Sequence, residues 1–231
     1  DLDAGVLSAR SYNVKQNTYK DVRQGQLGLN WTGNLANMGA EFTTWGLFRN
    51  LDNPIPPRII DLRRKAFGSR AVLSSMKNEE PGNLTWSIGT DLDYQRDSRK
   101  NFQNKSGTKG SLSLDQYETV SAIGFFAQGR TIVNEKISVM GGARYDYFQF
   151  GVTDHLTTNG SGDESGQRNM TSLSPTLGIH ANLNNTSSLY ANLATSFATP
   201  TTTELANRPD GAGGFNSELN PQKGLTGEIG I

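Results

Sequence analysis

The chain has 231 residues with 22 basic and 22 acidic side chains, so no excess of positive charge favours nucleic acid as a partner. It contains no cysteine, which excludes disulfide frameworks, thiolate metal sites and thiol nucleophiles. Only 34% of the residues are hydrophobic, and no apolar run approaches the roughly 18 residues that a membrane-spanning helix needs. Helical membrane proteins are therefore excluded, whereas membrane barrels are not, because a barrel strand faces lipid with every second residue only.

Segments in which apolar and polar side chains alternate recur along the whole chain, and this pattern predicts β-strands. The weakest of them, near residues 58–76, is also compatible with a short helix. The fold predicted is all-β with about ten strands. They lie near residues 4–12, 22–33, 38–49, 58–76, 83–96, 116–132, 136–150, 172–184, 187–198 and 224–231.

The alternation divides each strand into an apolar face and a mostly polar face. Between residues 136 and 150, Tyr145 and Tyr147 share the apolar face, while Arg144 and Asp146 share the polar one. Other predicted strands repeat the arrangement. The apolar faces also include Leu27, Leu29, Trp31, Leu84, Trp86, Ile88, Leu92, Tyr94, Ile137, Val139, Leu177, Ile179, Leu189, Leu193 and Phe197.

The predicted connections alternate in length. Short turns follow residues 33, 76, 132 and 184, and long polar loops span residues 50–58, 96–116, 151–170 and 198–224. An antiparallel up-and-down meander with short turns at one end and long loops at the other is typical of outer-membrane β-barrels. Alternation by itself is also what a half-buried strand of a soluble sandwich shows. We expect the chain to be part of a larger barrel, since its last segment stops as a strand begins.

Four motifs in the second half resemble those of the TonB-dependent outer-membrane receptors. Residues 124–128 (GFFAQ) precede residues 141–146 (GGARYD), which are similar to a G-x-R-Y-D strand of that family. Residues 173–178 (LSPTLG) and 188–200 (SLYANLATSFATP) are similar to the next strands. Residues 218–231 resemble an L-x-P-E pattern followed by a strand that begins E-x-G, with Gln222 in place of the glutamate.

The resemblance covers residues 118–231 by motif and the first half by pattern alone. It implies a partial barrel domain over residues 1–231, within a transmembrane barrel of about 22 strands. It also implies a plug and a segment that contacts the TonB energy-coupling protein, both expected outside this chain. The family's function would be active import of a scarce ligand, such as a ferric siderophore, across the bacterial outer membrane.

Candidate ligand-binding residues lie in the predicted 96–116 loop and next to it. Arg96, Arg99 and Phe102 could bind an anionic chelate through charge and stacking, although a solvated loop is the favoured interpretation. Tyr94, at the start of this loop, is either a residue of the lipid-interface girdle or a platform for the ligand.

Arg144 and Asp146 are candidates inside the barrel, where they would face the plug or the substrate path. A structural ion pair is the favoured interpretation, because wide barrels carry many charges in their lumen. The spacing of Glu204, Asp210 and Glu218 fits no calcium loop.

We expect a transport receptor and not an enzyme, with no cofactor or bound metal, since neither His155 nor His180 has nearby partners for a triad or a zinc site. The expected partners are outer-membrane lipid, the TonB protein and an iron–siderophore complex or other small ligand, and no nucleic acid. The alternatives are an adhesin-like or porin-like barrel and a secreted β-sandwich that binds its partner in solution.

Overall fold

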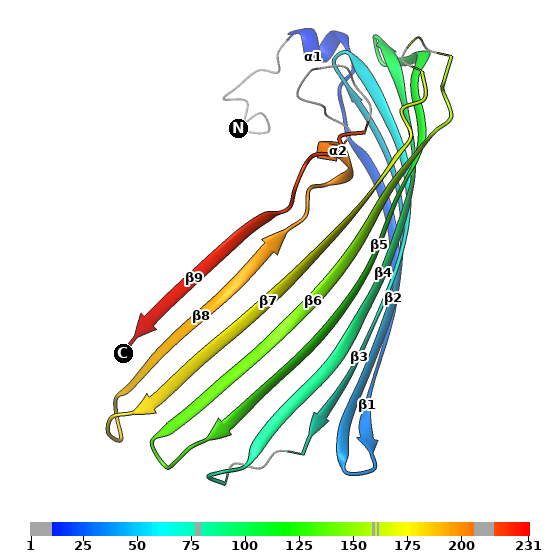
Figure 1. Ribbon diagram of the computed structural model, residues 1–231. Helices are drawn as coiled ribbons and strands as arrows, with labels where there is room; N and C mark the ends of the chain where they lie inside the picture. Colours follow the sequence, from blue (N-terminus) through cyan, green and yellow to red (C-terminus); the bar gives the residue numbers. More distant parts are fainter. Residues whose placement is uncertain (1–10, 77–79, 159, 161, 206–214) are drawn as a thin grey trace.

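The computed structural model describes residues 11–76, 80–158, 160, 162–205 and 215–231. Nine strands form one sheet in which every strand pairs antiparallel with its neighbours in the sequence, from β1 at one edge to β9 at the other (Figure 1). The elements are α1 (Ser11–Lys15), β1 (Asp21–Leu35), β2 (Met38–Ile55), β3 (Arg58–Ser75), β4 (Leu84–Lys105), β5 (Thr108–Ile132), β6 (Ile137–Asp154), β7 (Gly166–Asn182), β8 (Ser188–Ala198), α2 (Thr202–Leu205) and β9 (Gln222–Gly230).

The up-and-down order and nine of the predicted strands are confirmed. The ambiguous segment near residues 58–76 is β3 and pairs along its whole length with β2. Most of the first predicted strand, near residues 4–12, lies outside the described residues, and its last two positions belong to α1. No helix among the described residues is long and apolar enough to cross a membrane.

Two of the four predicted long loops are wrong, because the chain continues there as paired strands. The strands β2 and β3 extend to a turn at Pro56 and Pro57, and β4 and β5 extend to a turn at Ser106 and Gly107. Ser106 and Gly107 both have positive φ, at 53° and 89°, which is the conformation that a two-residue hairpin turn requires. The polar character of residues 96–116 therefore reflects strands with polar side chains on both faces.

The other two long connections are present. Residues 155–165 join β6 to β7, and residues 199–221, which include α2, join β8 to β9. Both lie at the end of the sheet that carries the two extended hairpins. We call this end the loop end, and the opposite end, with the connections that follow β1, β3, β5 and β7, the turn end.

The predicted division into two faces is present, and the apolar face is exposed. Leu84 is 59% exposed, Ile88 45%, Leu177 60% and Ile179 47%. These side chains therefore do not share a sealed core, and a β-sandwich would have required one. An exposed apolar face of this extent indicates a surface covered by another molecule or by a membrane.

The alternation breaks at the loop end of β8. Paired residues of β7 and β8 end at Thr176 and Ala194. Beyond them, the ring of Phe197 packs edge-on against Phe148, with centroids 5.7 Å apart. Phe148 lies on the face of Arg144 and Asp146, so the predicted place of Phe197 on the apolar face is wrong. The reason is that β8 separates from β7 after Ala194, although it stays paired with β9 at Phe197.

Replacing Ile88 with lysine tests which medium covers the apolar face. A lysine there would lie about midway along the apolar part of β4, where it should cost about 2–4 kcal/mol in a bilayer. Ser87→Lys is the matched control, because its side chain points to the polar face. We expect urea titration of the protein in lipid vesicles to show destabilisation for Ile88→Lys only, and equal effects would contradict this orientation.

Candidate ligand-binding site

The face of the sheet that carries Arg144 and Asp146 is called here the inner face, and the opposite, apolar one the outer face. At the loop end, α2 and residues 215–219 pack on the inner face (Figure 1). Leu205 at the end of α2 is fully buried against Phe150 of β6 and Met170 of β7. Phe215 and Leu219 complete this apolar cluster. The β8–β9 connection is thus anchored to the inner face at both of its described ends.

Polar contacts hold the same connection in place. Arg99 of β4 donates a hydrogen bond from Nη1 to Thr203 Oγ1 at 3.4 Å, and Arg168 of β7 donates from Nη2 to Asn220 Oδ1 at 2.8 Å. The β8–β9 connection therefore contacts β4 and β7, which lie three positions apart in the sheet. This reach indicates that the inner face is concave at the loop end.

A capping box begins α2. The Glu204 carboxylate accepts hydrogen bonds from the backbone N–H of Thr201, at 2.7 Å, and from its hydroxyl, at 3.0 Å. In return, the N–H of Glu204 donates to Thr201 Oγ1 at 3.2 Å. The backbone N–H of Thr201, and then its hydroxyl, hold the pKa of Glu204 below its usual value. The contribution of this cap is therefore complete above the ordinary glutamate pKa and is lost as pH falls through the lowered one.

Next to α2 on the inner face lies a first group of ion pairs, called here the upper layer. Arg64 of β3 forms two hydrogen bonds with the fully buried Asp97 of β4, Nε to Oδ1 at 2.8 Å and Nη2 to Oδ2 at 2.7 Å. Next to it, Arg99 pairs with the buried Glu118 of β5 at 3.3 Å, and Gln116 donates to the same carboxylate at 2.7 Å. Buried carboxylates of this kind are stable only when they are paired and hydrogen-bonded.

A lower layer of ion pairs surrounds Gly124. Arg144 binds Asp146 through Nε, at 2.8 Å and 2.9 Å from the two oxygens, and also binds Asp91 of β4. Arg70 of β3 pairs with the same Asp91 at 3.2 Å. A Cβ at Gly124 would overlap the guanidinium of Arg144 and come within 2.7 Å of an Asp146 oxygen. Glycine at this position gives the ion pairs the space above the strand.

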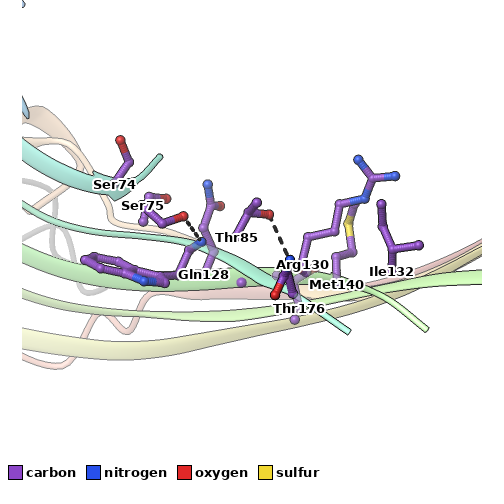
Figure 2. Close-up of a pocket in the computed structure, with 13 residues that line it drawn as sticks. Ser74, Ser75, Thr85, Gln128, Arg130, Ile132, Met140 and Thr176 are labelled. Atoms are coloured by element: carbon purple, nitrogen blue, oxygen red, sulfur yellow. Dashed lines mark hydrogen bonds between the residues drawn. The ribbon is translucent and has the colours of Figure 1, made fainter. Parts of the chain in front are cut away.

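A hollow of about 520 Å³ lies near the turn end of the inner face. Figure 2 shows its wall, in which Arg130 and Met140 stand beside Thr176 and Gln128. Trp86 borders it, with its backbone N–H bonded to Ser75 Oγ at 2.9 Å. The lining mixes hydroxyl, amide and guanidinium groups with apolar side chains, so it could hold a polar surface laid against the inner face.

The structure confirms the predicted ion pair between Arg144 and Asp146 and places it on the inner face. Sequence reasoning did not identify Asp97, Glu118 and Asp91 as the carboxylates that pair with arginines on this face. Strand alternation placed each residue on its own face, but only the register brings residues of different strands into one layer.

The prediction of a loop at residues 96–116 is wrong, and the hairpin found there separates the four candidate ligand-binding side chains. Arg99 points to the inner face, whereas Arg96 points to the outer face, where its guanidinium lies 4.0 Å from the ring centroid of Tyr117. Phe102 lies near the hairpin turn, with Lys109 Nζ 5.1 Å from its ring centroid. Tyr94 is exposed on the outer face. Strand alternation therefore prevents these four residues from forming one site.

Among the described residues, no three His, Asp or Glu side chains lie close enough together to hold a metal ion. Asp210, one of the acidic residues considered above for calcium, lies outside the described part of the chain.

The sequence matches the family described as TonB dependent receptor-like, beta-barrel, over residues 2–231. The chain belongs to the TonB-dependent receptor family. This membership places the sheet in the bacterial outer membrane as part of a β-barrel. The outer face therefore contacts lipid, and the inner face lines the lumen.

Solved structures of the family share the fold at low sequence identity. The copper transporter OprC has a TM-score of 0.72 and 16% identity, over 94% of this chain and 37% of that one. The ferric citrate transporter FecA, in its unliganded form, has a TM-score of 0.68 and 14% identity, over 92% and 32%. The ferric yersiniabactin uptake receptor FyuA of Yersinia pestis has 0.65 and 12%, over 92% and 33%. The chain spans about a third of the length of these proteins.

Gly124→Ala tests the packing of the lower ion-pair layer. The added methyl must displace Arg144 and Asp146, so we expect a loss of about 1–3 kcal/mol in the free energy of unfolding. Gly141→Ala is the control, since its Cβ would make an ordinary 3.7 Å contact with Leu177. Thermal unfolding in detergent measures both, and equal melting temperatures for the two variants would show that the layer tolerates displacement.

Leu205→Ala tests the anchoring of the β8–β9 connection. Loss of the buried side chain leaves a cavity beside Phe150 and Met170, and such truncations cost about 2–5 kcal/mol. Hydrogen exchange should then accelerate at the Asn216 amide, which donates to the Leu205 carbonyl, with little change in the middle of β6. Unchanged exchange at Asn216 would show that Arg99 and Arg168 anchor the connection without the apolar cluster.

Proposed function

We propose that this TonB-dependent receptor chain helps to import a scarce metal chelate, such as a ferric siderophore, with energy from the TonB complex. The loop end would receive the ligand from outside, and the inner face would line its path. The observation that carries the proposal is the layered arrangement on that face, in which a connection anchored by Leu205 lies against the upper of two layers of ion pairs.

The upper layer supports a role in ligand contact better than the lower one does. Arg99 lies next to α2 and contacts both Glu118 and Thr203. A ligand that moves α2 would therefore also change the surroundings of Arg99. Arg144 and Asp146 lie nearer the turn end on β6 and are joined to β4 through Asp91. We propose that Arg99 contacts the ligand and that Arg144 and Asp146 hold the wall of the path.

Tyr94 and Arg96 have no place in this proposal, because their side chains are on the lipid side of the wall. Phe102 is retained in the proposal only as a contact for the ligand at the hairpin that ends β4. FecA is a ferric citrate transporter, FyuA a ferric yersiniabactin uptake receptor and OprC a copper transporter, and the fold they share with this chain supports the metal-chelate class. In the proposal, the hollow near Arg130 is where the lumenal plug would lie against the wall.

The test is uptake by cells that carry the intact receptor as their one route for the chelate. We expect import of at least one radiolabelled ferric chelate from a panel, and its loss when the TonB complex is removed. Arg99→Gln should weaken binding of that chelate about tenfold, since a charge-assisted contact is lost. Lys136→Gln, an equal change of charge at a turn-end connection, is the control.

Two results would contradict the proposal. Import that continues without the TonB complex would remove energy coupling. Failure to import any of the ferric chelates, together with import of an unrelated nutrient, would remove the chelate class and leave the family assignment unchanged.

A further inference from the structure

The residues that precede β1 contact two hairpins at the loop end. Residues 11–20 comprise α1 and the segment that leads into β1, and Figure 1 shows α1 beside the hairpin turns. One hairpin is β2–β3, which turns at Pro56 and Pro57, and the other is β4–β5, which turns at Ser106 and Gly107. We call residues 11–20 the strap.

Asn104 of β4 joins the strap to both hairpins. It is buried, with 7% of its surface exposed, and its Nδ2 donates hydrogen bonds to the Gln16 carbonyl at 2.8 Å and to the Ile55 carbonyl at 3.4 Å. Its Oδ1 accepts a hydrogen bond from the N–H of Gly107 at 2.7 Å, and its own N–H donates to the Pro57 carbonyl at 2.9 Å. This one residue therefore holds the strap and both hairpin turns together.

The strap makes two more contacts with the hairpins. Tyr19 donates a hydrogen bond from its hydroxyl to Asp52 Oδ2 of β2 at 2.6 Å. Asn17, which has a φ of 46°, lies against Gly107, where an added Cβ would be 2.6 Å from the Cβ of Asn17. These contacts lie outside the backbone ladder of the sheet, so the strap could detach while the strands stay paired.

The attached strap buries two oxygen atoms that receive no hydrogen bond within the described part of the chain. They are Oε1 of Gln16 and Oδ1 of Asp52. Asp52 also lies directly opposite Asp21 of β1 and Asp61 of β3, so like charges meet there. A buried acceptor without a donor costs at least as much as an ordinary hydrogen bond contributes. The contacts that hold the strap and the costs of its closure are therefore similar in size.

We propose that the strap is a releasable cover on the two hairpins, which detaches from Asn104 and Asp52 as a unit. When attached, it occupies the hydrogen-bonding groups of both side chains. When it is released, water reaches Gln16 Oε1 and Asp52 Oδ1, which offsets the lost bonds. Release also opens Asn104 and Asp52 to molecules outside the cell, which the loop end faces in this class of barrel. This device does not depend on the ligand or the transport proposed above.

The experiment uses the intact receptor with two spin labels. They are attached at Lys15→Cys in the strap and Thr108→Cys in the β4–β5 hairpin, as its only cysteines, since both positions are exposed. Pulsed electron spin resonance measures the distribution of distances between the labels. We expect a main population at short distance, with the strap attached, and a smaller one at longer distance, with the strap released.

Two variants weaken the strap at different points. Tyr19→Phe removes the bond to Asp52, and Asn104→Asp removes the donor to Gln16 while it keeps the acceptor for Gly107. Each should raise the ratio of released to attached strap about fivefold, the effect of one ordinary hydrogen bond. The matched control is Tyr12→Phe, which removes the hydroxyl of an exposed tyrosine in α1 and should leave the ratio unchanged.

A second label pair separates release of the strap from unfolding of the hairpins. Labels at Arg58→Cys and Thr108→Cys join the two hairpins, and their distance should stay constant in Tyr19→Phe, which alters no hairpin residue. If this distance changes in Asn104→Asp, the result for Tyr19→Phe decides. The proposal is overturned if Tyr19→Phe leaves the strap attached, if it moves the hairpins as well, or if Tyr12→Phe releases the strap equally.

Discussion

The hydrogen-bonding needs of the backbone in lipid are the constraint on which this structure depends. Hydrocarbon offers no partner to an N–H or C=O group, so each strand must pair along its full length within the membrane. The antiparallel order meets this requirement for β2 to β8 with neighbours in sequence alone, whereas β1 and β9 each pair on one side within the described chain. Once the pairing is set, side chains can point in only two directions, toward lipid or toward the lumen.

This division explains why exposed leucines and buried carboxylates occur in the same strand. On β4, Ile88 contacts lipid, while Asp91 and Asp97 point inward and pair with arginines. These two carboxylates are stable on the lumen side because an arginine from another strand reaches each of them. The ion pairs thus join β3, β4, β5 and β6 across the lumen wall, in addition to the backbone ladder.

Outside the hydrocarbon, the paired strands no longer need an apolar face. The hairpins that end in Ser106 and Gly107 and in Pro56 and Pro57 continue the sheet with polar side chains on both faces. Water satisfies the charges there, so polarity no longer distinguishes a strand from a loop. On the outer face of β4, this boundary of the hydrocarbon lies near Tyr94 and Arg96. On the inner face, α2 covers the corresponding level.

The sequence by itself determined the all-β class, the family and the face of almost every strand residue, because a period of two and the motifs near Gly124, Gly141 and Pro200 are local signals. It also predicted that Arg144 and Asp146 form an ion pair, since they are two residues apart on one face. Only the tertiary structure decided that residues 96–116 form a hairpin, that Asp91 and Arg144 meet, and that Leu205 packs on Phe150. Those contacts depend on strand register and on how a connection folds back, and both are set by pairing between residues far apart in the chain.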